Sequence, residues 1–159
     1  MGDLHDTVAA LARRVQVLED ELAIHRLIVR YGLAVDVGDA DGAADVFTED
    51  GVYDVDVGLM RGRNAVAAMV RGERHQSMVG RCAHQIGPAV VELDGDRAVA
   101  TGYSRVYLRG DEATAIHRVS LNRWELERRE GAWLIVRRTT RVLGHAEARA
   151  IFQTALAPD

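Results

Sequence analysis

The chain has 159 residues and a net charge of −4, with 48% apolar and 28% charged residues, which is the balance of a folded globular protein. Charges of both signs are interleaved, which argues against a nucleic-acid-binding surface, and no segment approaches the roughly 18 consecutive apolar residues of a membrane span. The single cysteine, Cys82, excludes an internal disulfide, and the acidic, polar N-terminus is unlike a secretory signal. We therefore expect one cytoplasmic domain over residues 1–159 that binds neither nucleic acid nor a membrane.

The first expected element is a long helix over residues 5–35. Its first part, residues 5–22, is an amphipathic extension in which apolar residues recur at alternating spacings of three and four. These residues are Val8, Leu11, Val15, Leu18 and Leu22. The pattern is typical of a coiled-coil seam, which is buried either against the body of the protein or against a neighbouring subunit, and it predicts self-association. Gly38 ends the helix.

Short elements of mixed type follow the helix. Residues 39–42 have the composition of a turn, and residues 43–47 are expected to form one short helix. Apolar and polar residues alternate over 51–57, which predicts a strand, and glycines break the pattern over 58–62. Residues 63–75 are amphipathic with helical spacing.

The second half of the chain is rich in strand-forming residues. Four such runs are separated by short turns that contain Gly and Asp or Glu, which are hairpin signals. The runs are 82–93, 97–109, 113–128 and 132–143, and a last short helix is expected over 146–156. Helices followed by a meander of strands predict an α+β fold, with a curved antiparallel sheet that forms a cone-shaped barrel around a pocket and helices over its open face.

Asp36 and His84 are the candidate acid–base residues. Asp36 continues an apolar helix face through Val29 and Leu33, so its carboxylate is expected to be desolvated and could act as a base. The alternative is a residue at a helix end that points to water. His84 lies near the start of a strand, and histidine is the usual acid–base group near neutral pH when a carboxylate orients it. The alternative is a core histidine bonded to the backbone.

Several other polar residues could line the pocket. Ser120 and Asn122 share a strand face with Trp124, a combination that suits a wall that orients a ligand, although an ordinary surface strand has the same pattern. Tyr31 and Tyr53 could line a cavity, or they could be packing residues with a hydrated hydroxyl.

Arg138 lies on the opposite face of the last strand from its neighbours Arg137 and Arg141, so at least one of these arginines could point inward. The alternative is that all three arginines lie on a solvated face or at a subunit interface. The other histidines show no metal-ligand spacing, and the sequence has no nucleophile elbow, phosphate loop or dinucleotide fingerprint. We therefore expect no metal and no cofactor.

Several segments, in order and spacing, resemble SnoaL-like members of the nuclear transport factor two-like superfamily. They are 27–41, 46–53, 61–66, 82–87 and 129–133, and the resemblance covers roughly residues 18–145. The chain is most similar to the group that contains scytalone dehydratase, hexachlorocyclohexane dehydrochlorinase and bile-acid dehydratase. This resemblance implies a cystatin-like α+β barrel, cofactor-independent chemistry and a homotrimer, with a dimer as the second expectation.

The resemblance also implies roles for individual residues. Asp36 and His84 match the aspartate and histidine that abstract a proton beside a leaving group. Substrate-binding positions of the group are matched by Tyr31, Ser120, Asn122 and Arg138. The chain departs from scytalone dehydratase at Val35 and Val55, where that enzyme has tyrosines, so the resemblance does not extend to its substrate.

The leading hypothesis is a cofactor-independent lyase or isomerase of dehydratase type. In it His84 removes a proton from a small hydrophobic, cyclic or polyketide-like molecule, and Asp36 orients the imidazole. Two alternatives remain open. One is a small-molecule-binding or accessory domain in which the pair is structural. The other is a polyketide cyclase in which Asp36 is the acid–base group.

Overall fold

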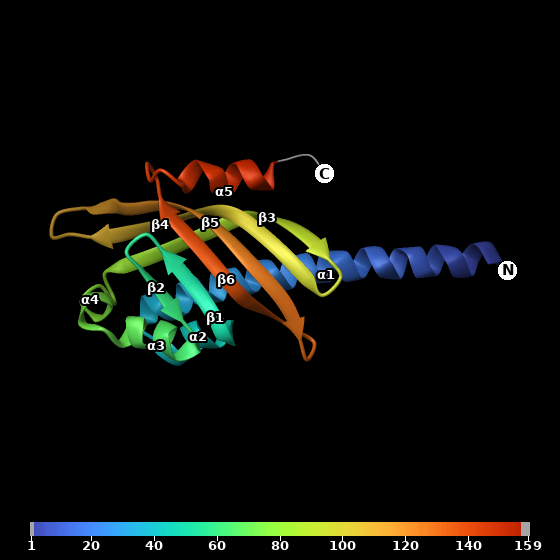
Figure 1. Ribbon diagram of the computed structural model, residues 1–159, viewed down its shortest axis with the longest axis horizontal. Coiled ribbons are helices and arrows are strands. Elements are labelled where there is room, and N and C mark those ends of the chain that lie inside the picture. Colours follow the sequence, from blue (N-terminus) through green and yellow to red (C-terminus); the bar gives the residue numbers. More distant parts are fainter. Residues whose placement is uncertain (1, 157–159) are drawn as a thin grey trace.

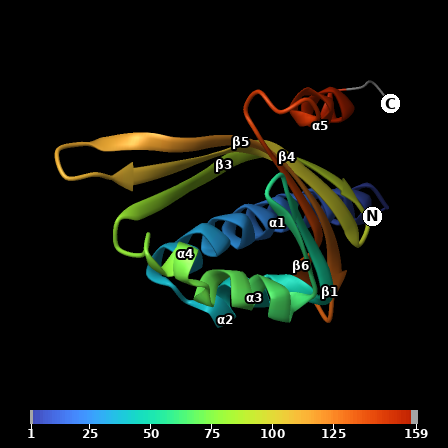
Figure 2. The ribbon, with the colours of Figure 1, turned by 60° about the vertical axis from the view of Figure 1, so that its left-hand side comes forward.

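The computed structural model describes residues 2–156 as one curved sheet with helices on both of its faces (Figure 1). Helices α1 to α4 lie on the concave side of the sheet and α5 lies on the convex side (Figure 2). The helices are α1 (Gly2–Val37), α2 (Ala40–Asp45), α3 (Arg63–Arg71), α4 (Glu73–Gln76) and α5 (Ala148–Ala155). The strands are β1 (Phe47–Val55), β2 (Gly58–Arg61), β3 (Cys82–Asp94), β4 (Arg97–Arg109), β5 (Thr114–Arg129) and β6 (Ala132–Val142). The α+β prediction is confirmed.

The sheet has the strand order β2-β1-β6-β5-β4-β3, so β2 and β3 form its edges and the barrel does not close. Strands β3 to β6 are the predicted antiparallel meander, with bounds within one residue of those expected. The expected antiparallel sheet contains one parallel pair, β1 and β6, with Val52 opposite Arg137. No hairpin joins these two strands, so their connection does not impose an antiparallel direction.

Four predicted elements between the long helix and the meander need correction. The strand expected over 51–57 is β1, which begins earlier, at Phe47, and ends at Val55. The short helix covers 40–45 rather than 43–47, because the Asp39 side chain accepts a hydrogen bond from the Gly42 backbone N–H at 2.9 Å and begins the helix early. The expected break at 58–62 contains strand β2, which pairs with β1. The expected helix over 63–75 is two helices, because the backbone is extended at Gly72.

The core lies between the inner face of α1 and the concave face of the sheet. Helix α1 contributes Ile24, Ile28, Tyr31 and Val35, and the sheet contributes Phe47, Trp124, Leu126 and Ile135. A polar contact fastens the middle of α1 to the sheet. The buried carboxylate of Asp20 accepts two hydrogen bonds from Arg128, at 2.8 and 2.6 Å, and one from the indole of Trp133 at 3.1 Å. Helix α1 is thereby fixed along the sheet, and its C-terminal end is fixed with it.

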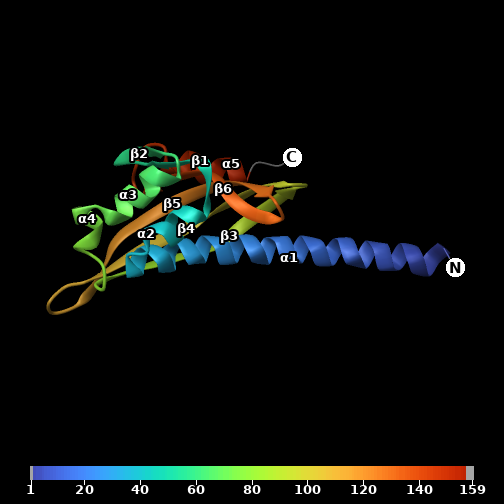
Figure 3. The same ribbon diagram turned by 90° about the horizontal axis from the view of Figure 1, so that it is seen from below.

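The N-terminal part of α1 projects beyond the sheet (Figure 3). The apolar stripe predicted over residues 5–22 is exposed along its length, from Val8 at 56% to Leu22 at 49%. The body of the protein therefore does not bury this stripe. Within residues 2–156, no helix combines the length and the apolar character needed to cross a membrane.

Candidate functional site

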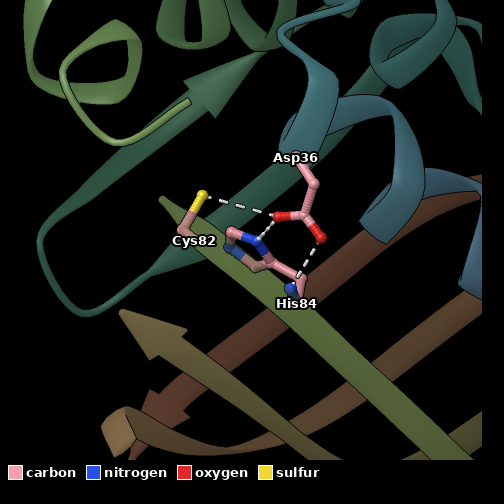
Figure 4. A group of neighbouring side chains, drawn as sticks. All are labelled: Asp36, Cys82 and His84. Carbon is pink, nitrogen blue, oxygen red and sulfur yellow. Dashed lines mark hydrogen bonds and ion pairs between the residues drawn. The ribbon is translucent and has the colours of Figure 1, made fainter. Parts of the chain in front are cut away.

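Asp36 and His84 are in direct contact at the junction of α1 and β3 (Figure 4). His84 Nδ1 lies 2.6 Å from Asp36 Oδ1, and the backbone N–H of His84 donates to Asp36 Oδ2 at 2.7 Å. One carboxylate therefore holds both the side chain and the backbone of the histidine. Gly32 allows this close approach, because a Cβ at that position would lie 3.1 Å from the His84 carbonyl oxygen.

The electrostatics of the pair favour a charged aspartate and a defined histidine tautomer. Burial alone would raise the pKa of Asp36, but the hydrogen bonds from the His84 side chain and backbone, together with that from Cys82, hold it below its usual value. Because an ionised carboxylate only accepts hydrogen bonds, Nδ1 of His84 carries the proton. The other ring nitrogen, Nε2, is then the atom that can accept a proton.

The sequence pointed to Asp36 for a reason that the structure does not support. Val29 and Leu33, which were expected to share its apolar surroundings, are exposed. The partial burial of Asp36 comes instead from β3, whose residues Cys82 and His84 contact the carboxylate. The environment of Asp36 therefore depends on a strand more than 40 residues away in the sequence, and not on its own helix face.

Cys82 completes a hydrogen-bonded triad with Asp36 and His84. Its Sγ lies 3.5 Å from Asp36 Oδ1, and burial together with the charge of Asp36 raises the pKa of the thiol to about 11. The three residues have ligand atoms within 4.8 Å of one another, so they could hold a metal ion. However, the mutual hydrogen bonds occupy Nδ1 and both carboxylate oxygens, and metals bind the thiolate rather than the thiol. The donor set therefore fits a hydrogen-bonded triad better than a metal centre.

His84 lines a cavity of about 230 Å³ between the sheet and the helices α1, α3 and α4. Tyr31 and Tyr53, for which the sequence left a cavity wall or simple packing open, also line it. Most of the remaining wall is aliphatic or thioether, contributed by Val35, Val55, Val57, Met60, Met69, Met78 and Val106. Such a cavity suits a small apolar molecule whose orientation is fixed by a few polar groups.

Sequence reasoning missed four polar residues of the cavity wall, namely Arg74, His75, His117 and Arg118. His75 is buried, its Nε2 donates to the Val35 carbonyl at 2.7 Å, and its ring centroid lies 6.5 Å from that of His84. Arg118 pairs with Asp56 and donates to Ser120 Oγ at 2.8 Å. No spacing motif identifies these residues, because they come together only when α4 packs on the end of α1 and β5 crosses the sheet.

A model of the SnoaL-like domain matches residues 16–139. The chain belongs to the SnoaL-like family. A nuclear transport factor two-like protein with a cystatin-like fold from Novosphingobium aromaticivorans is 41% identical, with a TM-score of 0.86, 90% of this chain covered and 95% of the other. A protein of unknown function from Mycobacterium tuberculosis is 28% identical, with a TM-score of 0.74 and coverage of 90% and 89%.

A candidate scytalone dehydratase from Novosphingobium aromaticivorans has a TM-score of 0.68, with coverage of 79% and 85%, but at 18% identity it shows a common fold alone. Among curated proteins, none matches this chain. The SnoaL-like match includes Asp36, His84 and Arg138 but begins only at residue 16. The first part of the exposed stripe on α1 therefore precedes the residues that the SnoaL-like model matches.

The remaining predicted site residues of this SnoaL-like protein lie behind the cavity rather than on its wall. Ser120, Asn122 and Arg138 are 1%, 0% and 3% exposed. The amide of Asn122 is fully engaged: its Oδ1 accepts from Arg138 and from Thr140, and its Nδ2 donates to Ser104 Oγ at 2.9 Å. No free polar atom of Asn122 remains for a ligand.

Arg138 is a buried cation held mainly by aromatic rings. Its guanidinium carbon lies 4.7 Å from the ring centroids of both Tyr31 and Tyr53, and 5.5 Å from that of Trp124. Among the residues that the structure describes, no carboxylate pairs with it, and its Nη1 is buried without a hydrogen-bond partner. A buried charge without a counterion lies directly behind the two tyrosines that face the cavity, so it makes that end of the cavity attractive to negative charge.

Proposed function

We propose that this SnoaL-like protein is a cofactor-independent lyase or isomerase of dehydratase type, acting on a small apolar molecule, cyclic or polyketide-like, that carries a carbonyl oxygen. The proposal rests on the contact between Asp36 and His84. The Asp36 carboxylate accepts hydrogen bonds from both Nδ1 and the backbone N–H of His84, and the histidine lines an apolar cavity. An imidazole held in this way has one nitrogen committed to orientation and one available to accept a proton.

In the proposed reaction, His84 Nε2 removes a proton from the carbon next to the carbonyl group. The electron pair moves to the carbonyl oxygen to give an enolate, and Asp36 stabilises the imidazolium that forms. The enolate then expels a hydroxyl group from the neighbouring carbon, and the proton on Nε2 leaves with that group as water. If the proton returns instead to another carbon, the outcome is an isomerisation.

Tyr31 is the proposed donor to the enolate oxygen. Burial raises the pKa of Tyr31, although the positive charge of Arg138 opposes this effect, so the hydroxyl keeps its proton and can donate a hydrogen bond. Arg138 contributes positive potential from behind the ring at 4.7 Å. Ser120 and Asn122, which the resemblance implied as substrate-binding residues, are assigned a supporting role, because Asn122 holds Arg138 and Ser120 holds Arg118.

The state of Asp36 favours His84 as the acid–base group over the cyclase alternative. In that alternative Asp36 would exchange a proton with the substrate. Here the carboxylate already accepts from His84 Nδ1, from the His84 backbone and from Cys82, and these bonds lower its pKa. A carboxylate so stabilised is a weak base and a good orienting group.

The test is a dehydration assay on 4-hydroxy-4-phenyl-2-butanone, a one-ring β-hydroxy ketone whose loss of water gives a strongly absorbing conjugated enone. The rate with His84→Gln is expected to fall at least about 100-fold, the low end of general acid–base contributions. His117→Gln is the matched control, since His117 lines the same cavity without a carboxylate partner in the described chain, and its rate should stay within a few-fold of wild type. A folded His84→Gln protein with the wild-type rate would overturn the mechanism. Binding of the ketone without turnover by wild type would favour the binding-domain alternative.

A further inference from the structure

Helix α1 carries an exposed apolar seam that continues past the predicted extension. Leu4, Val8, Leu11, Val15, Leu18 and Leu22 are each about half exposed or more, and Val29, one heptad beyond Leu22, is 44% exposed although it lies where the helix packs on the sheet. In heptad notation Val8, Val15, Leu22 and Val29 occupy one core position, a, and Leu4, Leu11 and Leu18 occupy the other, d. Ten of the exposed large apolar residues of the described chain lie on this single helix.

The seam points away from the body of the protein. At 3.6 residues per turn, the mean direction of the seam differs by roughly 160° from that of Asp20, Ile24, Ile28 and Tyr31, which face the sheet. A second helix can therefore lie along the seam without displacing any contact of α1 with the core. The two bodies would then flank the helix pair, and each would keep its own cavity.

We propose that two copies of this chain associate through α1 as a parallel, two-stranded coiled coil. The core composition favours this arrangement over a trimer, because β-branched residues at a combined with leucine at d favour two strands. Val8 and Val15 are the β-branched residues, and Leu11 and Leu18 are the leucines between and after them. The proposal is independent of the proposed reaction, since the seam and the cavity lie on opposite sides of α1.

The charges beside the seam fit a parallel partner. In a parallel pair, position g of one helix faces position e of the following heptad in the other. Arg14 at g then faces Glu19 of the second copy, and Glu21 at g faces Arg26 of the second copy, so all four symmetric contacts join opposite charges. In the antiparallel register that aligns the same core residues, position g faces position g, and Arg14 meets Arg14 of the second copy. Charge therefore selects the parallel orientation.

The test of association is the mass of the full chain in solution, measured by light scattering over a range of concentrations. The wild type is expected at twice 17.5 kDa, and the variant Leu11→Glu with Leu18→Glu at 17.5 kDa. Val17→Glu is the matched control, because Val17 is also half exposed on α1 but lies off the seam, and it should remain dimeric. A monomeric or trimeric wild type, or a dimer that survives the double glutamate variant, would overturn the proposal.

Orientation is tested by cross-linking and by charge reversal. Leu4→Cys should form an intermolecular disulfide on oxidation, because residue 4 meets itself only in a parallel pair; in the antiparallel register it faces residue 22, about 27 Å along the helix from residue 4. Wild type, with Cys82 alone, is the control. Arg14→Glu should weaken the dimer roughly tenfold, and adding Glu19→Arg should restore it. Failure of both the cross-link and the rescue would exclude the parallel pair.

Discussion

Replacement of Arg138 by methionine is expected to leave the stability of the fold almost unchanged while impairing the site. Arg138 is buried, and removing a guanidinium from water costs several kcal/mol. Three aromatic rings oppose this cost: their centroids lie 4.7, 4.7 and 5.5 Å from the guanidinium carbon, and each ring contributes about 1–2 kcal/mol. A hydrogen bond to Asn122 contributes about 2 kcal/mol more. The two sides nearly cancel, and methionine fills similar space with apolar contacts. We therefore expect the free energy of unfolding to change by no more than about 1 kcal/mol.

Urea unfolding measures this difference, with Asn122→Ala as the comparison. That variant leaves the guanidinium and the Thr140 hydroxyl without their shared acceptor, so it should cost about 3 kcal/mol. Arg138→Met should also lower the rate of the β-hydroxy ketone reaction by tenfold or more, because the positive potential behind Tyr31 is lost. If Arg138→Met destabilises the fold as much as Asn122→Ala does and leaves the reaction rate unchanged, Arg138 is a structural residue and its assigned role in the site is wrong.

Three further predictions concern buried or partly buried acids and the thiol. Asp20→Ala should lower the free energy of unfolding by about 2–3 kcal/mol, because it removes the buried carboxylate that pairs with Arg128. Asp96→Ala removes an exposed partner of the same arginine and should cost less than about 1 kcal/mol, and equal losses in urea titrations would contradict this difference. The pKa of Cys82 is raised to about 11 from 9.0, so its alkylation by iodoacetamide at about pH 8 should be about 100-fold slower than that of an ordinary thiol. The alkylation of Cys82 should be faster in Asp36→Asn than in wild type, and an ordinary rate in wild type would refute the buried triad. The pKa of Asp36 is lowered in the folded state, so its contribution to stability is present above the unfolded value of 3.8 and is lost as the pH falls through the folded value. Wild type should therefore lose more stability than Asp36→Asn between about pH 5 and pH 2, and parallel stability curves would count against the pair.

Local patterns predicted the parts of the fold that local interactions decide. The meander from β3 to β6 follows from alternating runs and hairpin turns, and its bounds were correct within one residue. The early start of α2 was missed because it depends on a single cap, the Asp39 carboxylate on the Gly42 N–H. Strand β2 was missed because its few residues form a strand only by pairing with β1.

The site shows the same division between local and long-range causes. Asp36 and His84 were identified and they meet, yet the contact depends on the packing of α1 on β3 rather than on the helix face that suggested it. Alternation separated Arg138 from its neighbours, but the acceptor that holds it, Asn122, lies on another strand. His75 gave no signal in the sequence, since its place in the cavity is set by the packing of α4.

The central claim is that Asp36 orients His84 so that Nε2 serves the cavity, and the most direct test is the nitrogen-15 NMR spectrum of the histidine side chains. Spectra of wild type and Asp36→Asn would be recorded at alkaline pH, where a free imidazole is neutral, with and without 2-naphthol as an aromatic probe. We predict that His84 of wild type is protonated on Nδ1, that Asp36→Asn shifts the tautomer toward Nε2, and that the naphthol perturbs the Nε2 signal. If His84 has the same tautomer in both proteins and does not respond to the naphthol, the pair is not an orienting dyad in a binding cavity.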